Sequence, residues 1–302
     1  MKPVLFAMVI TGLVACSEDA PEMTDDPTAI RALRTLSSDE MQGRLAGTEG
    51  AAKARDYILS ELARMPCLDV VVQPFEFGVK GEEGFNIVAD YDDIDAGPLL
   101  VVTAHYDHLG PGPTGEIFNG ADDNASGVGA VLKLAEDACE TERVHDVRFV
   151  FYDAEEQGLA GARRYVEAAD GFDGRAVFNL NLDMVSQDDG GEIFASGTRG
   201  EPALRDLLDG VAKPDGVTLR YGYDNPADPP NDWTNQSDHA AFKGAGLPFL
   251  YLGVEDHPHY HAVTDEFESI PLEDYLNFIT LISNIEMALD ANLADLAEVQ
   301  GD

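Results

Sequence analysis

The sequence predicts an α/β protein with three layers, in which helices cover both faces of a mostly parallel, twisted sheet. Short, continuous apolar runs at residues 99–104, 147–152, 176–182 and 248–252 are typical of strands buried on both faces. Segments with helical periodicity separate these runs, and this alternation is typical of parallel sheets. No internal repeat or linker divides the series, so a single domain is expected over about residues 28–292.

The other elements follow from the same two kinds of pattern. Ile30, Leu33 and Leu36 lie on one face of a predicted short helix, and Ser126 is a good N-cap for the helix after it. Further strands are expected at 70–77, 85–91 and 217–221, and helices at 51–65, 127–138, 158–168, 202–211, 238–245 and 272–289.

The charge balance excludes one class of function. The chain has 57 acidic and 19 basic residues, a net charge of −38. Nucleic-acid binding needs a basic surface that displaces counterions, so no nucleic-acid partner is expected. The same charge disfavours attraction to anionic membranes. The acidity is explained either by solubility or by adaptation to salt, and both explanations stay open.

The first 15 residues are predicted to be a lipoprotein signal peptide. Lys2 precedes an apolar run at 4–14 that is too short to span a bilayer. The run ends in Leu13-Val14-Ala15-Cys16, which resembles a bacterial lipobox with Cys16 as the lipidated residue. A plain secretory signal is the alternative.

A lipidated Cys16 predicts the location of the mature protein. Ser17 follows the cysteine, which in Gram-negative lipoproteins goes with the outer membrane, facing the periplasm. Residues 16–27 are an expected acidic tether, and 293–302 an expected acidic tail. No other segment is long enough to span a membrane, so membrane contact is expected only through Cys16. The remaining cysteines, Cys67 and Cys139, form either a disulfide or two separate buried thiols.

Potential metal ligands gather where the four buried strands end. In open α/β sheets, ligands bind beyond the carboxyl ends of the strands. Each polar side chain there has an ordinary explanation by itself, as a turn or a solvated surface, but their convergence at one edge predicts a metal site. They are His105 and Asp107 after the first strand, Glu155 and Glu156 after the second, Asp183 after the third, and the loop with His257, His259 and His261 after the fourth.

These motifs resemble those of the co-catalytic zinc aminopeptidases of metallopeptidase family 28, clan MH. The resemblance covers about residues 28–290, includes the opening loop at 39–48, and implies the zinc-aminopeptidase version of the phosphorylase/hydrolase-like fold. The matching segments, in family order, are Ala104-His105-Tyr106-Asp107, Asp123-Asn124-Ala125-Ser126-Gly127, Glu155-Glu156, Asn181-Leu182-Asp183-Met184, and Tyr260-His261 with Asp265.

The resemblance implies a site for two zinc ions. Asp123 would bridge both ions, together with a water or hydroxide. His105 and Asp183 would complete one zinc site, and Glu156 and His261 the other. Each ion would then have one imidazole and two carboxylates, with a position open for water as a catalytic site requires.

The resemblance also implies the reaction, which is hydrolysis of N-terminal residues from peptides with a free N-terminus. Glu155 would be the general base, and Asp107 would accept the second N–H of the His105 ring and fix its tautomer. The peptide bond Asp123–Asn124 would be cis. His108 and His239 are given no direct part, and His261 is preferred to His257 and His259 because Asp265 follows it at the family spacing.

Three other functions fit the sequence less well than an aminopeptidase does. Family 20 carboxypeptidases insert a lid domain, for which the segment between Asp183 and His261 has no room. Glutaminyl cyclases share the fold but keep one zinc, whereas this chain retains the two-metal pattern. A non-catalytic lipoprotein scaffold would be expected to lack ligands or the base, and none is missing. The residue preference and the oligomeric state are left open.

Overall fold

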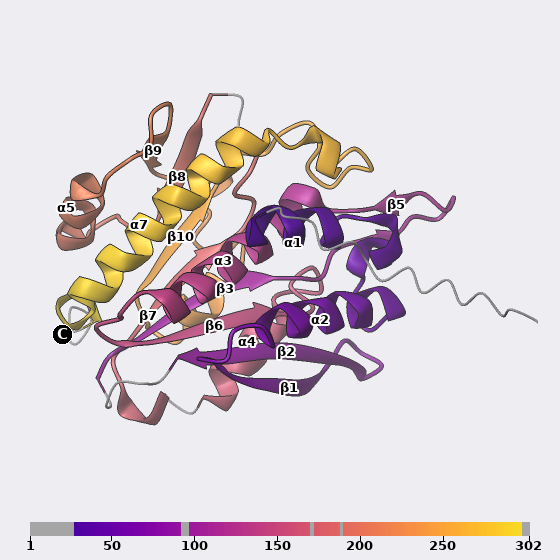
Figure 1. The fold of residues 1–302 in the computed structure, drawn as a ribbon, viewed down its shortest axis with the longest axis horizontal. Helices are drawn as coiled ribbons and strands as arrows, with labels where there is room; N and C mark the ends of the chain where they lie inside the picture. Colours follow the sequence, from indigo (N-terminus) through magenta and orange to yellow (C-terminus); the bar gives the residue numbers. More distant parts are fainter. Residues whose placement is uncertain (1–26, 92–96, 170–171, 188–189, 298–302) are drawn as a thin grey trace, which may run out of the picture.

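The structure is a computed structural model, and it describes residues 27–91, 97–169, 172–187 and 190–297 (Figure 1). The predicted signal peptide, Cys16 and residues 16–26 of the tether lie outside this part. So do Asp92, Asp93 and Asp95, and Asp188 and Asp189, which the sequence places in solvated turns.

One eight-stranded sheet forms the centre of the molecule. Its four middle strands run parallel, whereas β1, β2 and β8 join it by antiparallel pairing and β9 pairs parallel to β8. The predicted parallel arrangement is therefore confirmed at the centre, and the sheet as a whole is mixed. In spatial order the strands are β1 (Asp69–Phe77), β2 (Glu82–Tyr91), β6 (Asp146–Tyr152), β3 (Leu99–His105), β7 (Val177–Leu182), β10 (Phe249–Gly253), β8 (Glu192–Ser196) and β9 (Thr218–Tyr221).

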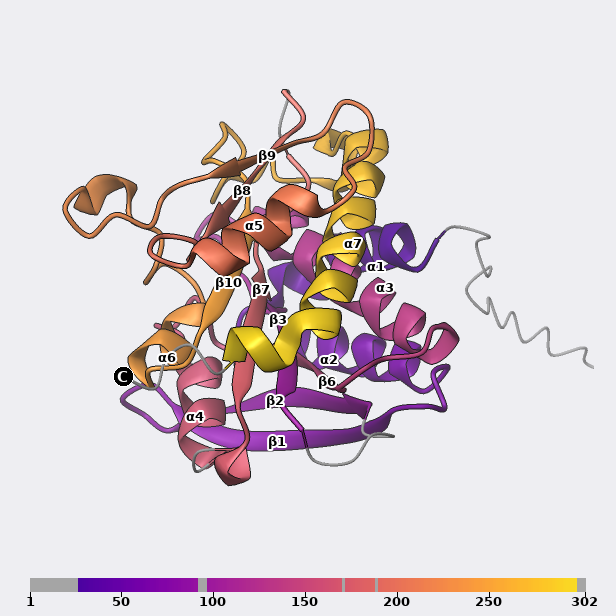
Figure 2. The same cartoon turned by 90° about the vertical axis from the view of Figure 1, so that its left-hand side faces the viewer.

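Helices cover both faces of this sheet, as the sequence predicts (Figure 2). Helices α2, α3 and α7 pack on one face, with α1 against α3 and α5 against α7, whereas α4 and α6 pack on the other. The helices are α1 (Thr28–Leu36), α2 (Glu49–Leu62), α3 (Gly127–Glu140), α4 (Ala160–Ala168), α5 (Pro202–Gly210), α6 (His239–Gly244) and α7 (Leu272–Ala297).

Strand β3 shows why a continuous apolar run belongs at the centre. Leu100 and Val102 point into the larger core beneath α3 and α7, whereas Leu99 and Val101 point into the smaller core beneath α4 and α6. Successive side chains of a strand face opposite sides, so a strand with a core on each side needs apolar residues at every position.

The structure differs from the sequence prediction most clearly at two places, besides the short unpredicted pair β4 (Gly110–Pro111) and β5 (Ile117–Phe118). Strand β8 was not predicted, because its five residues carry no long apolar run and it is a strand through its pairing with β10. Helix α7 runs through Ala297, five residues beyond the predicted domain end, because Leu293 and Leu296 are still buried. Within the described residues, no helix is both long and apolar enough to cross a membrane.

Of the two alternatives for the cysteines, the disulfide is present. It joins Cys67, which follows α2, to Cys139 near the end of α3, with Cα atoms 5.6 Å apart. The bridge closes a segment of 72 residues and so restrains the unfolded chain.

Helix α7 carries a buried carboxyl group that should make stability depend on pH. Glu286 is fully buried, with one oxygen 3.3 Å from Nε of Arg143, and burial raises its pKa to about 7. Between its unfolded value near 4.5 and this folded value, the folded state holds a proton that the unfolded state lacks. The free energy of unfolding should therefore fall as pH rises from about 5 to 7, by about 3 kcal/mol from this residue.

Glu286→Gln is expected to remove that part of the pH dependence. Urea titrations from pH 5 to pH 8 would measure it, with Glu140→Gln, on the exposed end of α3, as the control. Equal slopes for Glu286→Gln and the unchanged protein would contradict the assignment.

Candidate active site

The structure brings all the predicted metal ligands to one small cavity at the carboxyl ends of the four parallel strands. The cavity measures about 60 Å³, and its other walls are formed mainly by Met184, Trp233, Tyr251 and Tyr260. The predicted residues that line it are His105, Asp123, Glu155, Glu156, Asp183 and His261. Asp107 is buried behind them.

The two oxygens of Asp123 face two different sets of groups. Nε2 of His105 lies 3.4 Å from Oδ1 of Asp123 and 3.3 Å from Oδ1 of Asp183. Nε2 of His261 lies 3.1 Å from Oδ2 of Asp123 and 3.4 Å from Oε1 of Glu156. Ligand atoms about 2.0–2.1 Å from a tetrahedral zinc ion are about 3.3 Å from one another, so both sets have the spacing that zinc requires.

The turn that carries Asp123 is held from several directions. Its peptide bond to Asn124 is cis, as the family resemblance implies. The carboxylate of Asp265 accepts hydrogen bonds from the backbone N–H groups of Asp122, at 2.9 Å, and Asp123, at 3.0 Å. Gly120 begins the turn with φ +57°, where a side chain would collide with the Asp123 carbonyl and the His108 ring.

Asp107 does more than the sequence predicts. Its carboxylate accepts hydrogen bonds from the backbone N–H groups of Glu155, at 2.9 Å, and Glu156, at 3.3 Å. The distance from Nδ1 of His105 to Oδ1 of Asp107 is 3.7 Å, whereas the backbone carbonyl of Asp107 lies 3.2 Å from the same nitrogen. The carbonyl is therefore the closer partner of the His105 ring, and the carboxylate mainly positions the two glutamates.

Glu155 has the electrostatics expected of a general base. Burial, reinforced by the charges of Asp238 and Asp183, raises the pKa of Glu155 well above its ordinary value, against the opposing effect of His105. A carboxylate with a raised pKa is a stronger base, so it can accept a proton near neutral pH.

The loop after β10 contains three histidines, of which only His261 approaches Asp123 and Glu156. His257 instead lies with Nε2 3.0 Å from Oδ2 of Asp122, and Nδ1 of His259 lies 2.9 Å from the hydroxyl of Thr264. His239 is also elsewhere: its Nε2 lies 2.9 Å from the carbonyl of Trp233, and burial lowers its pKa to about 4.

His108 lies among the potential metal ligands, although the sequence prediction gives it no direct part. It is completely buried, with Nδ1 3.0 Å from Oε1 of Glu156 and 3.7 Å from Oδ2 of Asp123. The donor atoms of these three side chains all lie within 4.8 Å of one another, so His108 could also serve as a ligand or hold Glu156 in place. The sequence feature that could have indicated this position is that His108 directly follows Asp107, three residues after the predicted ligand His105.

Arg44 is the other residue without a predicted role, although it lies in the opening loop that carries the resemblance. Its side chain is completely buried and donates to backbone carbonyls rather than to a carboxylate. These carbonyls belong to Tyr106 (2.7 Å), Leu36 (2.6 Å), Asn119 (2.5 Å), Gly120 (2.9 Å) and Asp123 (3.4 Å). One guanidinium therefore joins the peptide between His105 and Asp107 to the turn that carries Asp123.

Known proteins with similar sequences are peptidases. The sequence profile of peptidase family M28 matches residues 86–285. Leupeptin-inactivating enzyme 1 of Streptomyces exfoliatus is 26% identical over 83% of this chain and 56% of its own length. The probable lipoprotein aminopeptidase LpqL of Mycobacterium tuberculosis is 29% identical over 61% of this chain and 41% of its own. The chain thus spans about half the length of the curated relatives it matches.

Solved structures show that the fold is shared more widely. BSAP, a zinc aminopeptidase from Bacillus subtilis, superposes with a TM-score of 0.70 at 18% identity, over 86% of this chain and 93% of that one. A glutaminyl cyclase from Fimbriiglobus ruber superposes with a TM-score of 0.68 at 19% identity, over 87% and 95%. The fold is therefore compatible with both activities, whereas the profile match covers most of this chain. On that match, the chain belongs to peptidase family M28.

Proposed function

We propose that the protein is an aminopeptidase that holds two zinc ions and removes N-terminal residues from peptides. The observation that carries this proposal is that the two carboxylate oxygens of Asp123 face two different donor sets. One oxygen lies beside His105 and Asp183, and the other lies beside His261 and Glu156. Two sets of zinc-like donors that share one carboxylate are suited to a pair of ions.

In this proposal the chain's own residues move the protons and orient the groups. Two bound zinc ions would acidify a water molecule and polarise the scissile carbonyl. Glu155 takes the proton of the attacking water and then delivers it to the leaving amine. Asp107 fixes the backbone of Glu155 and Glu156, so the base and a ligand keep one relative position.

The size and charge of the cavity favour a peptide end over the middle of a chain. A cavity of about 60 Å³ admits a terminal group, and a free ammonium would meet several carboxylates there. Asp256 adds a further carboxylate to the wall. An internal peptide bond has no adjacent ammonium group, so a peptide bound there would not gain this attraction to the carboxylates.

Hydrolysis of aminoacyl-arylamides with and without a chelator tests the function. We expect chelation to abolish hydrolysis and zinc to restore it, with close to two zinc ions per chain by metal analysis. His105→Ala should lose bound zinc together with activity, whereas His145→Ala, far from the cavity, should lose neither. Full activity in chelator, or a zinc content that His105→Ala leaves unchanged, would contradict the proposal.

A glutaminyl cyclase is the second candidate, because cyclases share this fold. The complete donor set around His105 and Asp183 favours two metals and hence the aminopeptidase. A peptide with N-terminal glutamine separates the two: an aminopeptidase releases free glutamine, and a cyclase forms a blocked N-terminus.

We also propose that the mature protein is anchored through lipidated Cys16 at the outer membrane, facing the periplasm. The lipobox-like segment supports this, and a lipoprotein name among the relatives is consistent with it. In a Gram-negative host, palmitate labelling should mark the protein and be lost in Cys16→Ala. Labelling that survives this change would contradict the anchor.

A further inference from the structure

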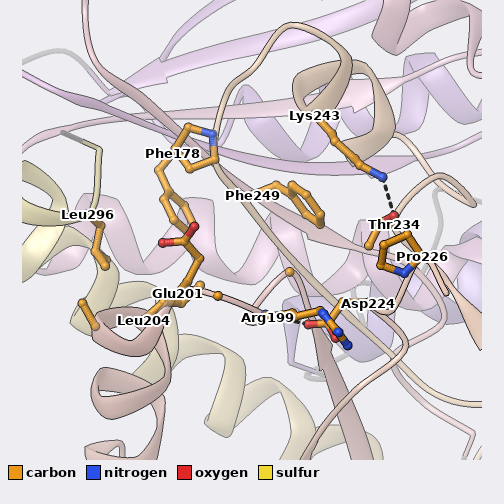
Figure 3. Close-up of a pocket in the computed structure, with 14 residues that line it drawn as sticks. Phe178, Arg199, Glu201, Leu204, Asp224, Pro226, Thr234, Lys243, Phe249 and Leu296 are labelled. Carbon is orange, nitrogen blue, oxygen red and sulfur yellow. Dashed lines mark hydrogen bonds between the residues drawn. The ribbon is translucent and has the colours of Figure 1, made fainter. Parts of the chain in front are cut away.

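A second cavity, of about 480 Å³, lies at the amino ends of β7 and β10, the opposite ends from the candidate active site (Figure 3). Its volume falls in the usual range for small-molecule sites, roughly 300–1,000 Å³. We propose that this cavity binds a free α-amino acid with an apolar side chain, at a site separate from the proposed metal centre. The proposal goes beyond the proposed function, because none of the predicted site residues lines this cavity.

The cavity has an apolar side that fits such a side chain. Phe178, the second residue of β7, and Phe249, the first residue of β10, contribute their rings, and Leu204 and Leu296 approach from α5 and α7 (Figure 3). Phe249 is only half-buried, so part of its ring remains open to a ligand. Covering apolar surface of this kind favours binding of an apolar side chain.

Charged groups of both signs line the rest of the cavity, as a zwitterion requires. Arg199 and Lys243 are cationic, in a chain whose net charge is −38, and Glu201 and Asp224 are anionic. Among the described residues, the guanidinium of Arg199 and the carboxylate of Glu201 make no hydrogen bond or ion pair. Arg199 is therefore available to a ligand carboxylate, because a guanidinium recognises carboxylates by paired hydrogen bonds.

Residues that are neighbours in the chain line the two cavities, which makes binding observable. Tyr223 and Trp233 stack with ring centroids 3.7 Å apart, and Trp233 lines the metal-site cavity. Their chain neighbours Asp224 and Thr234 line the second cavity. Trp233 is the only tryptophan in the chain, so its fluorescence reports on this region alone.

Equilibrium dialysis with L-leucine tests the proposal on the whole protein, both zinc-loaded and chelator-treated. We expect one leucine per chain in both states, with a saturable change in Trp233 fluorescence. Leucinamide and N-acetylleucine, which each lack one charge, and glycine, which lacks the apolar group, should bind about tenfold more weakly to the chelator-treated protein, which cannot hydrolyse leucinamide.

Variants locate the binding. Arg199→Glu should weaken leucine binding about tenfold, and Ala203→Phe should obstruct the cavity, whereas Arg164→Glu on exposed α4 should change nothing. Both test residues are exposed, so the fold should survive, and unchanged circular dichroism and urea unfolding would confirm that it does. Absence of leucine binding overturns the proposal, as does binding that is lost with zinc or unaffected by Arg199→Glu. None of these outcomes depends on whether the aminopeptidase activity itself is found.

Discussion

Glu155→Gln is expected to lower kcat for arylamide hydrolysis by about 10³-fold while zinc content stays near that of the unchanged protein. An amide cannot accept the proton of the attacking water. A carboxylate oxygen of Glu155 also lies within 4.8 Å of the donor atoms of His105 and Asp183, so the zinc content of the variant separates a base from a metal ligand. The backbone N–H of Glu155 still donates to Asp107 after the substitution, so the position of Glu156 should be kept. Rates and metal content measured on the same preparation provide the test.

Glu167→Gln is the matched control, because Glu167 is an exposed glutamate on α4 that only pairs with Arg164. It should leave kcat unchanged. Substantial hydrolysis by zinc-loaded Glu155→Gln would remove Glu155 from its role. Loss of zinc along with activity would make it a metal ligand instead.

Arg44→Lys is expected to destabilise the protein by several kcal/mol although the charge is kept. Arg44 reaches five backbone carbonyls, and an ammonium with three donors on one point cannot reach all of them. Each buried carbonyl left without a donor costs about 1–3 kcal/mol. Because four of these carbonyls, those of Tyr106, Asn119, Gly120 and Asp123, belong to the segments that carry His105 and Asp123, zinc affinity should fall as well.

Chemical unfolding and zinc competition with a chelator would measure the two effects separately. Arg163→Lys, a surface substitution on α4, is the control and should change neither. A zinc affinity that is unchanged in folded Arg44→Lys would limit Arg44 to a structural role. Unchanged stability would show that the carbonyls find other partners.

The strands were predictable where the pattern of apolar residues along the sequence matches the burial of those residues in the fold. The apolar runs of β3, β6, β7 and β10 are buried on both faces, so their sequences carry the information. Strand β8 has no such run, and it becomes a strand through its pairing with β10 on one side and β9 on the other. The end of α7 was likewise not predictable from local pattern, because the helix continues to Ala297 where Leu293 and Leu296 are buried against the rest of the fold.

The sequence by itself determined the family, the alternation of strands and helices, and the potential metal ligands and base that line the candidate active site. It could do so because short motifs at strand ends hold residues that local chain geometry already directs to one edge. Only the tertiary structure decided which nearby groups act on those motifs. Arg44 holds five distant carbonyls, His108 turns toward Glu156, and Asp107 bonds to a loop 48 residues away. Such contacts join segments far apart in the chain, and no local pattern records which backbone groups will face a given side chain.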